Sequence, residues 1–129
     1  MPEKTIIRTE NAPAPFQGAP YSQGIRFGDL VFVSGQLPVN PATGKLVEGG
    51  IAEQTEQVME NLKAILEAAG TSLANALKAT IFLADLADFA GMNDVYARYV
   101  GDRPPARATF QVAGLPAGAR LEIEVVAHA

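Results

Sequence analysis

Residues 51–70 read IAEQTEQVMENLKAILEAAG, and this stretch decides the class of fold. Its apolar side chains recur every three or four residues, which is typical of one face of an α-helix. The positions on this stripe are Ile51, Thr55, Val58, Leu62, Ile65, Leu66 and Ala69. Most charged side chains lie off the stripe, and Gly70 provides a stop signal. We therefore expect a helix over residues 51–69 that packs one face against other elements.

Short apolar runs bounded by turn residues predict about six strands around this helix. We expect these strands at residues 5–8, 21–27, 29–34, 78–83, 108–112 and 121–127. The run Leu30-Val31-Phe32-Val33 is apolar at every position, as in a strand that is buried on both faces. Residues 40–44 (NPATG) predict a turn.

A second helix is expected before the last two strands. Asp85 or Asp88 is suited to cap it, and its apolar positions, among them Tyr96 and Tyr99, run to about Val100. Two helices can cover only one face of a six-stranded sheet, so the other face must meet solvent or another subunit. The sequence therefore predicts a mixed α/β (α+β) fold in a single domain, residues 1–129.

The composition excludes several classes of site. The 129 residues include no cysteine and one histidine, His128, near the C-terminus. Disulfides, thiol nucleophiles and thiolate metal sites are thereby excluded, and a Ser-His-Asp triad has almost nothing to draw on. No phosphate-binding loop or dinucleotide fingerprint is present. We expect any enzymatic activity to need neither a metal nor another cofactor.

Charge and hydropathy bear on partners and location. The formal net charge of −4 argues against binding to nucleic acid, whose phosphates are neutralised by lysine and arginine. No apolar run reaches the ~20 residues of a membrane span, so we expect no membrane association. The N-terminus shows no signal-peptide core, and the expected location is the cytoplasm.

Arg107 and Glu122 are the candidates with the most chemical content. Arg107 alternates with apolar residues in one late strand and Glu122 in the next, so both are expected on the uncovered face if these strands are neighbours. A guanidinium can grip a carboxylate through two hydrogen bonds, and a carboxylate can orient water and exchange a proton with it. The pair suits a small α-carboxylate substrate that reacts with water. Spacing alone favours the other interpretation, a cross-strand ion pair that fixes register.

Five further residues are candidate ligand contacts. Ser34 and Gly35 end the strand at 29–34, where backbone N–H groups are free and glycine permits close approach. Tyr21, Asn93 and Thr109 supply polar groups. Each of these residues, taken singly, is explained as well by a structural role.

Several short motifs occur in the order found in one known family. They include residues 20–24 (PYSQG), 33–38 (VSGQLP), 41–44 (PATG), 105–109 (PARAT) and 121–124 (LEIE). Gln54 and Asn61 in the first helix, and Phe89, Asn93 and Tyr96 in the second, also match. The ordered set resembles the RidA/YjgF family of reactive imine and enamine deaminases over nearly the whole chain.

The resemblance implies a chorismate-mutase-like fold: a six-stranded mixed sheet with two helices on one face, in a homotrimer with clefts between subunits. It implies cofactor-free hydrolysis of 2-imino acids, the tautomers of 2-aminoacrylate and 2-aminocrotonate, to 2-keto acids and ammonia. The implied catalytic residues are Arg107, which binds the substrate carboxylate, and Glu122, which holds or activates the attacking water.

The resemblance also implies that Tyr21, Ser34, Gly35 and Asn93 line the pocket. Thr109 stands where many bacterial relatives have cysteine, which leaves the substrate preference open.

Two other functions remain open at this stage. A non-catalytic module that binds a small carboxylate, such as a keto acid, would use the same arginine. The presence of Glu122 favours catalysis, because anion binding gains nothing from a nearby carboxylate. A ribonuclease, a label that relatives have carried, is disfavoured by the acidic balance and by the lack of a basic, aromatic surface.

Overall fold

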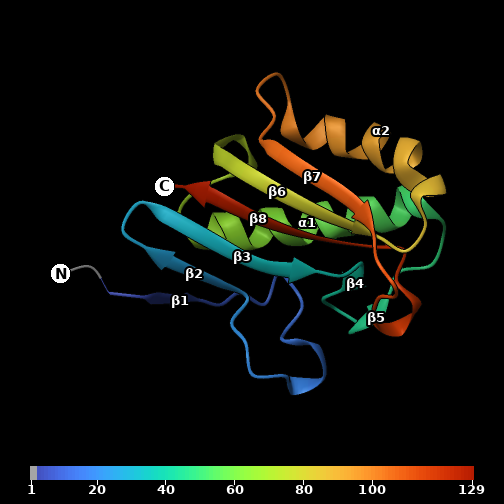
Figure 1. Ribbon diagram of the computed structural model, residues 1–129. Coiled ribbons are helices and arrows are strands. Elements are labelled where there is room, and N and C mark those ends of the chain that lie inside the picture. Colours follow the sequence, from blue (N-terminus) through green and yellow to red (C-terminus); the bar gives the residue numbers. More distant parts are fainter. Residues whose placement is uncertain (1–2) are drawn as a thin grey trace.

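The computed structural model describes residues 3–129 and has two layers, a twisted sheet and a pair of helices (Figure 1). Six strands form the sheet in the order β1-β2-β3-β8-β6-β7. Their bounds are Thr5–Ile7 (β1), Gly24–Phe27 (β2), Leu30–Gln36 (β3), Ala76–Leu83 (β6), Ala106–Gln111 (β7) and Leu121–His128 (β8). β6 and β7 are parallel and the other neighbours are antiparallel, so the sheet is mixed.

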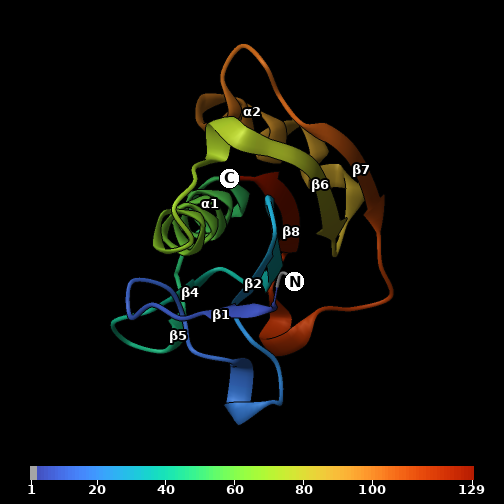
Figure 2. The ribbon, with the colours of Figure 1, turned by 90° about the vertical axis from the view of Figure 1, so that its left-hand side faces the viewer.

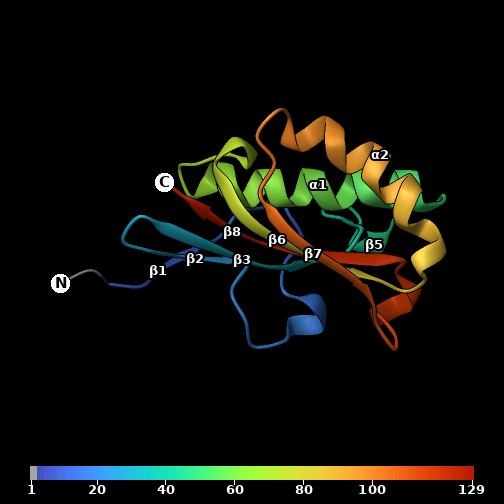
Figure 3. The same cartoon turned by 45° about the horizontal axis from the view of Figure 1, so that its top comes forward.

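Helices α1 (Ile51–Ala68) and α2 (Phe89–Val100) lie on the same side of the sheet (Figure 3). The predicted stripe of α1 is buried: Val58, Leu62 and Ile65 are fully enclosed against the strands. Full burial of one such side chain contributes about 1.5–3 kcal/mol. Figure 2, which looks nearly along α1, shows the strands curving past one side of the helix. The expected fold class, a six-stranded mixed sheet with two helices on one face, is confirmed.

The smaller elements follow the predicted signals with local differences. Residues 40–44 form the turn of a separate hairpin, β4 (Val39–Asn40) with β5 (Lys45–Leu46). Of the two candidate caps, Asp85 accepts a hydrogen bond from the amide of Ala87 (2.8 Å) and starts a short 3-10 turn before α2. Asp88 pairs instead with Arg120. No helix within residues 3–129 combines the length and apolar character needed to cross a membrane.

The face of the sheet opposite the helices is open and carries several exposed apolar side chains. Val31 and Val33 point to the helices and are buried, whereas Phe32 is 44% exposed on the other side. The expectation that β3 is buried on both faces is therefore wrong for the single chain. Ile6, on β1, is 46% exposed, and exposed apolar patches of this kind commonly mark interfaces.

The expectation that the last two strands are neighbours is also wrong, because β6 lies between β7 and β8. β6, α2 and β7 form a parallel strand-helix-strand unit, and such a connection places its two strands side by side. The chain then returns to the far side of β6 to form β8. The alternation of side chains within a strand carries no information about this order.

The prediction that Arg107 and Glu122 share the uncovered face is wrong as well. Arg107 is in register with the buried Ala79 of β6, so it lies on the face covered by the helices. Glu122 is in register with Phe82, the opposite parity of β6, and lies on the uncovered face. The cross-strand ion pair that spacing alone favoured is therefore absent from residues 3–129.

Candidate functional site

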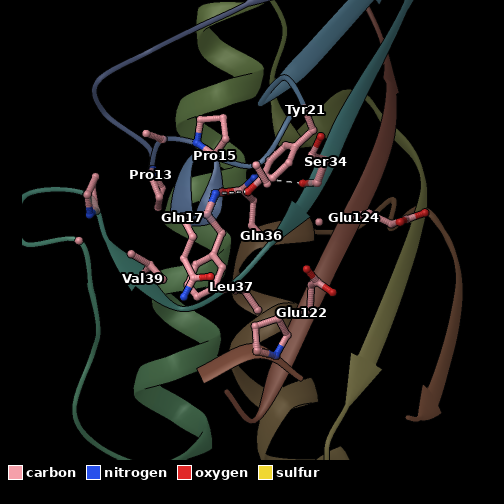
Figure 4. A pocket seen from close by; sticks show the side chains of 17 residues that line it. Pro13, Pro15, Gln17, Tyr21, Ser34, Gln36, Leu37, Val39, Glu122 and Glu124 are labelled. Carbon is pink, nitrogen blue, oxygen red and sulfur yellow. Dashed lines mark hydrogen bonds between the residues drawn. The ribbon is translucent and has the colours of Figure 1, made fainter. Parts of the chain in front are cut away.

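A cavity of about 1030 Å³ opens on the uncovered face, near the end of β3 (Figure 4). Four parts of the chain line it: the loop between β1 and β2, the end of β3 with the hairpin that follows, Pro116 in the turn before β8, and β8 itself. Four of the predicted site residues line this cavity: Tyr21, Ser34, Gly35 and Glu122. We call it the acidic pocket, because it holds both Glu122 and Glu124, while no lysine or arginine within the described chain lines it.

Gly35 and Glu122 are in close contact in the acidic pocket. A Cβ atom built on Gly35 would lie 2.8 Å from Oε2 of Glu122, closer than real Cβ atoms come to such a neighbour. Any side chain at position 35 would therefore push the carboxylate away. The glycine of β3 is required for the observed position of the Glu122 carboxylate beside the strand.

The surroundings of Glu122 make its carboxylate more basic. The side chain is half-buried, and burial is the main reason that its pKa is raised above the ordinary glutamate value, with the charge of Glu124 as a second cause. Burial disfavours the ionised form, and a second negative charge does the same. A carboxylate with a raised pKa is a better proton acceptor at neutral pH than a solvent-exposed one.

Tyr21 and Ser34 lie near one end of the acidic pocket (Figure 4). The Tyr21 hydroxyl oxygen accepts a hydrogen bond from the amide of Phe16 (2.6 Å), and the Ser34 hydroxyl donates to the carbonyl oxygen of Ser22. Tyr21 precedes β2 rather than belonging to it, although the sequence predicts a strand from residue 21. Both hydroxyl groups therefore already contact the loop between β1 and β2.

Arg107 lies in a second group of residues, between β7 and α2. One of its guanidinium nitrogens, Nη1, donates to Oδ1 of Asn93 (2.7 Å). The guanidinium carbon also lies 5.4 Å from the ring centre of Phe89 and 5.1 Å from that of Tyr96, within the range of cation–π attraction. Within residues 3–129 an ion pair forms between Arg120 and Asp88 alone, so Arg107 has no carboxylate partner there.

Thr109 lies on the same face of β7 as Arg107, since it is in register with the buried Ile81. Its hydroxyl oxygen is buried and has no hydrogen-bond partner within the described chain. The buried hydroxyl groups of Tyr96, beside Arg107, and of Thr55, in the core, have no partner within the described chain either. Arg107, Asn93 and Thr109 thus form a group with unused donors, separate from the acidic pocket.

The sequence predicts Phe89 and Tyr96 as apolar positions of the second helix, and Tyr96 as a core residue rather than part of the site. Tyr96 is buried as expected, and burial raises the pKa of its hydroxyl group, so that it stays neutral beside Arg107. Phe89, Asn93 and Tyr96 are four and three residues apart and share one face of α2. This spacing shows that the three side chains lie together on α2. It does not show that they face β7 and Arg107.

Comparison with known proteins identifies the family of this chain. The family model described as endoribonuclease L-PSP matches residues 9–129. A RutC family protein from Pyrococcus horikoshii is 51% identical over 125 residues, which cover 97% of this chain and 98% of that protein. A Bos taurus protein named 2-iminobutanoate/2-iminopropanoate deaminase is 48% identical over 124 residues, covering 96% and 89% of the two chains.

Solved structures agree with these sequence matches. The crystal structure of E. coli TdcF with bound serine matches with a TM-score of 0.90 and 41% identity, over 97% of this chain and 98% of that one. The similarity in sequence and in fold extends over nearly the full length of the chain. The chain therefore belongs to the YjgF/RidA family, whose family model carries the endoribonuclease L-PSP description.

Proposed function

We propose that this protein hydrolyses reactive 2-imino and enamine acids, of the 2-iminobutyrate and 2-aminoacrylate type, to 2-keto acids and ammonia. One observation carries the proposal: each chain holds two incomplete halves of such a site. The acidic pocket has a basic carboxylate and no cation, whereas Arg107 has oriented donors and no anion. Relatives named 2-iminobutanoate/2-iminopropanoate deaminase support the choice of substrate.

The two halves complete each other when copies of the chain associate. We propose a homotrimer, as the family resemblance implies, in which Arg107 of one chain lies against the acidic pocket of the next. In a closed ring, each copy contacts its neighbour through two different surfaces. Such a contact can bring together Arg107 and Glu122, which lie on opposite faces of the sheet in one chain. The exposed apolar side chains of the uncovered face, such as Ile6 and Phe32, supply surface for the contact.

Arg107 binds the substrate carboxylate through two parallel hydrogen bonds. The contact with Asn93 and the flanking rings of Phe89 and Tyr96 hold the guanidinium in one orientation before substrate arrives. A carboxylate fixed in this way places the imine carbon at a set position and lowers the entropic cost of the attack. The free hydroxyl of Thr109 and backbone groups near Gly35 provide further donors to the substrate.

Glu122 supplies the base. Its carboxylate takes a proton from a water molecule as the water oxygen bonds to the carbon of the protonated imine, and the C=N electron pair moves to nitrogen. The resulting neutral carbinolamine receives that proton from the Glu122 carboxyl group on its nitrogen. Its C–N bond then breaks with the electron pair leaving as ammonia, while loss of the hydroxyl proton forms the keto group. Each tenfold acceleration requires about 1.4 kcal/mol, which two oriented charged groups can supply.

A binding module for small carboxylates is the second candidate. The TdcF structure holds bound serine, a small molecule that carries a carboxylate. Such a module would use Arg107 in the same way but would not need Glu122 beside Gly35. Binding of a keto acid without turnover of any imine identifies this alternative. The cytoplasmic location stays a prediction from the sequence.

Replacing Arg107 tests the carboxylate contact. We expect Arg107→Ala to lower kcat/KM for ammonia release roughly a hundredfold or more, because two charge-assisted hydrogen bonds worth about 1.5–3 kcal/mol each are lost. Arg107→Lys should recover little activity, since lysine lacks the two-pronged geometry. The assay generates the imine in situ with an amino-acid dehydratase and follows ammonia release.

The exposed Arg98 of α2 provides the matched control, and Arg98→Ala should keep wild-type kinetics. Light scattering checks that the mass of each variant assembly is that of the wild type. Wild-type turnover by correctly folded Arg107→Ala would remove Arg107 from the mechanism.

Replacing Glu122 tests the base. Glu122→Gln keeps the shape of the side chain but cannot accept the proton, so kcat should fall by about 10²–10⁴-fold. The affinity for 2-ketobutyrate, measured by calorimetry, should change much less, because Arg107 provides that contact. If the variant forms product at the wild-type rate, Glu122 is a structural residue only.

The raised pKa of Glu122 predicts the pH profile. Activity requires the ionised carboxylate, so kcat/KM should fall as the pH drops through the pKa of Glu122. Within one chain burial and Glu124 raise this pKa, and Arg107 of the next chain acts in the opposite direction. Glu124→Gln removes the neighbouring negative charge, which lowers the pKa of Glu122 and moves this acidic limb to lower pH. The profile is recorded with excess dehydratase at every pH. A limb that stays in place, or moves upward, contradicts the assignment of Glu122 as the base.

A further inference from the structure

We propose that two buried amide side chains, Gln23 and Asn61, are positioning residues that hold two adjoining walls of the acidic pocket. Neither residue lines the pocket. Each donates hydrogen bonds to backbone carbonyl groups of a pocket wall that lies outside the main sheet. The expected effect of these residues on substrate binding rests on the proposed function. Their expected effect on the position of the pocket walls does not.

Gln23 holds the loop between β1 and β2. Its side chain is 5% exposed, and the two hydrogens of Nε2 are shared among three carbonyl oxygens, those of Thr9 (3.0 Å), Ala12 (3.2 Å) and Pro13 (2.8 Å). Its Oε1 accepts from the amide of Thr9 (2.8 Å). These backbone groups have no neighbouring strand, and backbone groups left unpaired in the interior destabilise the structure. The Gln23 amide therefore provides the hydrogen bonds to these backbone groups that a neighbouring strand provides within the sheet.

The loop that Gln23 holds leads directly into the pocket wall. Pro13 and Pro15 line the pocket, and the amide of the next residue, Phe16, donates to the hydroxyl of Tyr21. Gln23 follows Tyr21 by two residues, and its own carbonyl accepts from the amide of Ser34 (2.9 Å). Gln23 thus joins the start of the loop, the end of the loop and β3, and the position of Tyr21 depends on all three.

Asn61 holds the other wall from within α1. It is 1% exposed, and Nδ2 donates to the carbonyl oxygens of Leu37 (3.1 Å) and Val39 (2.9 Å). Oδ1 accepts from Nε2 of Gln57 (2.8 Å), which orients the amide. Leu37 and Val39 line the pocket just beyond the end of β3. The helix thereby sets the distance of this wall from Glu122.

The test replaces each amide with leucine, which is of similar size but cannot donate. Gln23→Leu should raise KM about tenfold and change kcat by less than about threefold, because the chemical groups remain while the wall moves. It should also speed hydrogen exchange of the Phe16 amide about tenfold, since the loop opens more often. Asn61→Leu should raise KM similarly and speed exchange at Phe16 by less than Gln23→Leu does, because it acts on the wall formed by Leu37 and Val39, against which Phe16 packs.

Leu66→Ala is the matched control. Leu66 is fully buried in the core and does not line the pocket, so this variant lowers stability without touching either amide. It should lower Tm and leave both KM and the Phe16 exchange rate, measured well below Tm, at wild-type values. If Gln23→Leu does not fold, Gln23→Asn, which shortens the amide by one methylene, takes its place with the same expected shifts.

The outcomes separate the two proposals. Wild-type KM and wild-type Phe16 exchange in a Gln23 variant whose Tm falls like that of Leu66→Ala would overturn the positioning role. Absence of imine turnover by the wild-type protein would overturn the proposed function only. In that case the exchange rate at Phe16 still decides whether Gln23 holds the loop.

Discussion

Arg107 and Glu122 point to opposite faces of one β-sheet, and the division of the proposed site into two halves follows from this constraint. Side chains alternate between the two faces of a strand with a period of two. The register of β6 with its neighbours aligns Ala79 with Arg107 and Phe82 with Glu122, so the guanidinium lies among the helices and the carboxylate lies outside. A site that uses both groups must therefore be completed by a second copy of the chain.

Each half is organised before the copies meet. Arg107 is oriented by an amide oxygen and two aromatic rings, none of which neutralises its charge. Glu122 lies against Gly35, in surroundings that raise its pKa. In the mechanism that we propose, neither half is sufficient alone. In the homotrimer that we propose, the exposed apolar side chains of the open face form part of the contact between copies, and this contact brings the anion-binding group and the base together.

The walls of the acidic pocket show a different way of fixing a site. The main sheet positions Gly35 and Glu122 through regular backbone pairing. The loops that face them lie outside that sheet and are held by the amides of Gln23 and Asn61. Buried amide networks specify one arrangement of a loop, because every donor needs its partner. The fold thus combines rigid strands for the charged group with amide-held loops for the surrounding surface.

The local sequence pattern predicted most helices and strands, because the periodicity of a helix or a strand depends only on residues that are close together in the sequence. The stripe from Ile51 to Ala69 and the alternation around Glu122 both correspond to observed elements. Strand order is a non-local property, so the alternation of Arg107 with its neighbours did not reveal which face it occupies. For the same reason the candidate residues form two groups, with Asn93, Arg107 and Thr109 apart from the acidic pocket.

The sequence pattern also could not predict the contacts of Gly35 and Gln23, because their partners lie far away along the chain. The sequence marks Gly35 as a place of close approach but does not say that Glu122 is the neighbour. The glutamine at position 23 belongs to a recognisable motif, yet its carbonyl partners lie 10 to 14 residues away in a loop without periodicity. Such contacts follow from the path of the chain in three dimensions.

Mixing two inactive variants tests the central claim most directly. Arg107→Ala and Glu122→Gln chains are unfolded together, refolded in equal amounts, and assayed for imine hydrolysis beside each variant refolded alone. If every site takes Arg107 from one chain and Glu122 from the next, random assembly into closed rings restores about a quarter of the wild-type activity. Activity no higher than that of the separate variants, in assemblies shown by mass to be mixed, would contradict a site shared between chains.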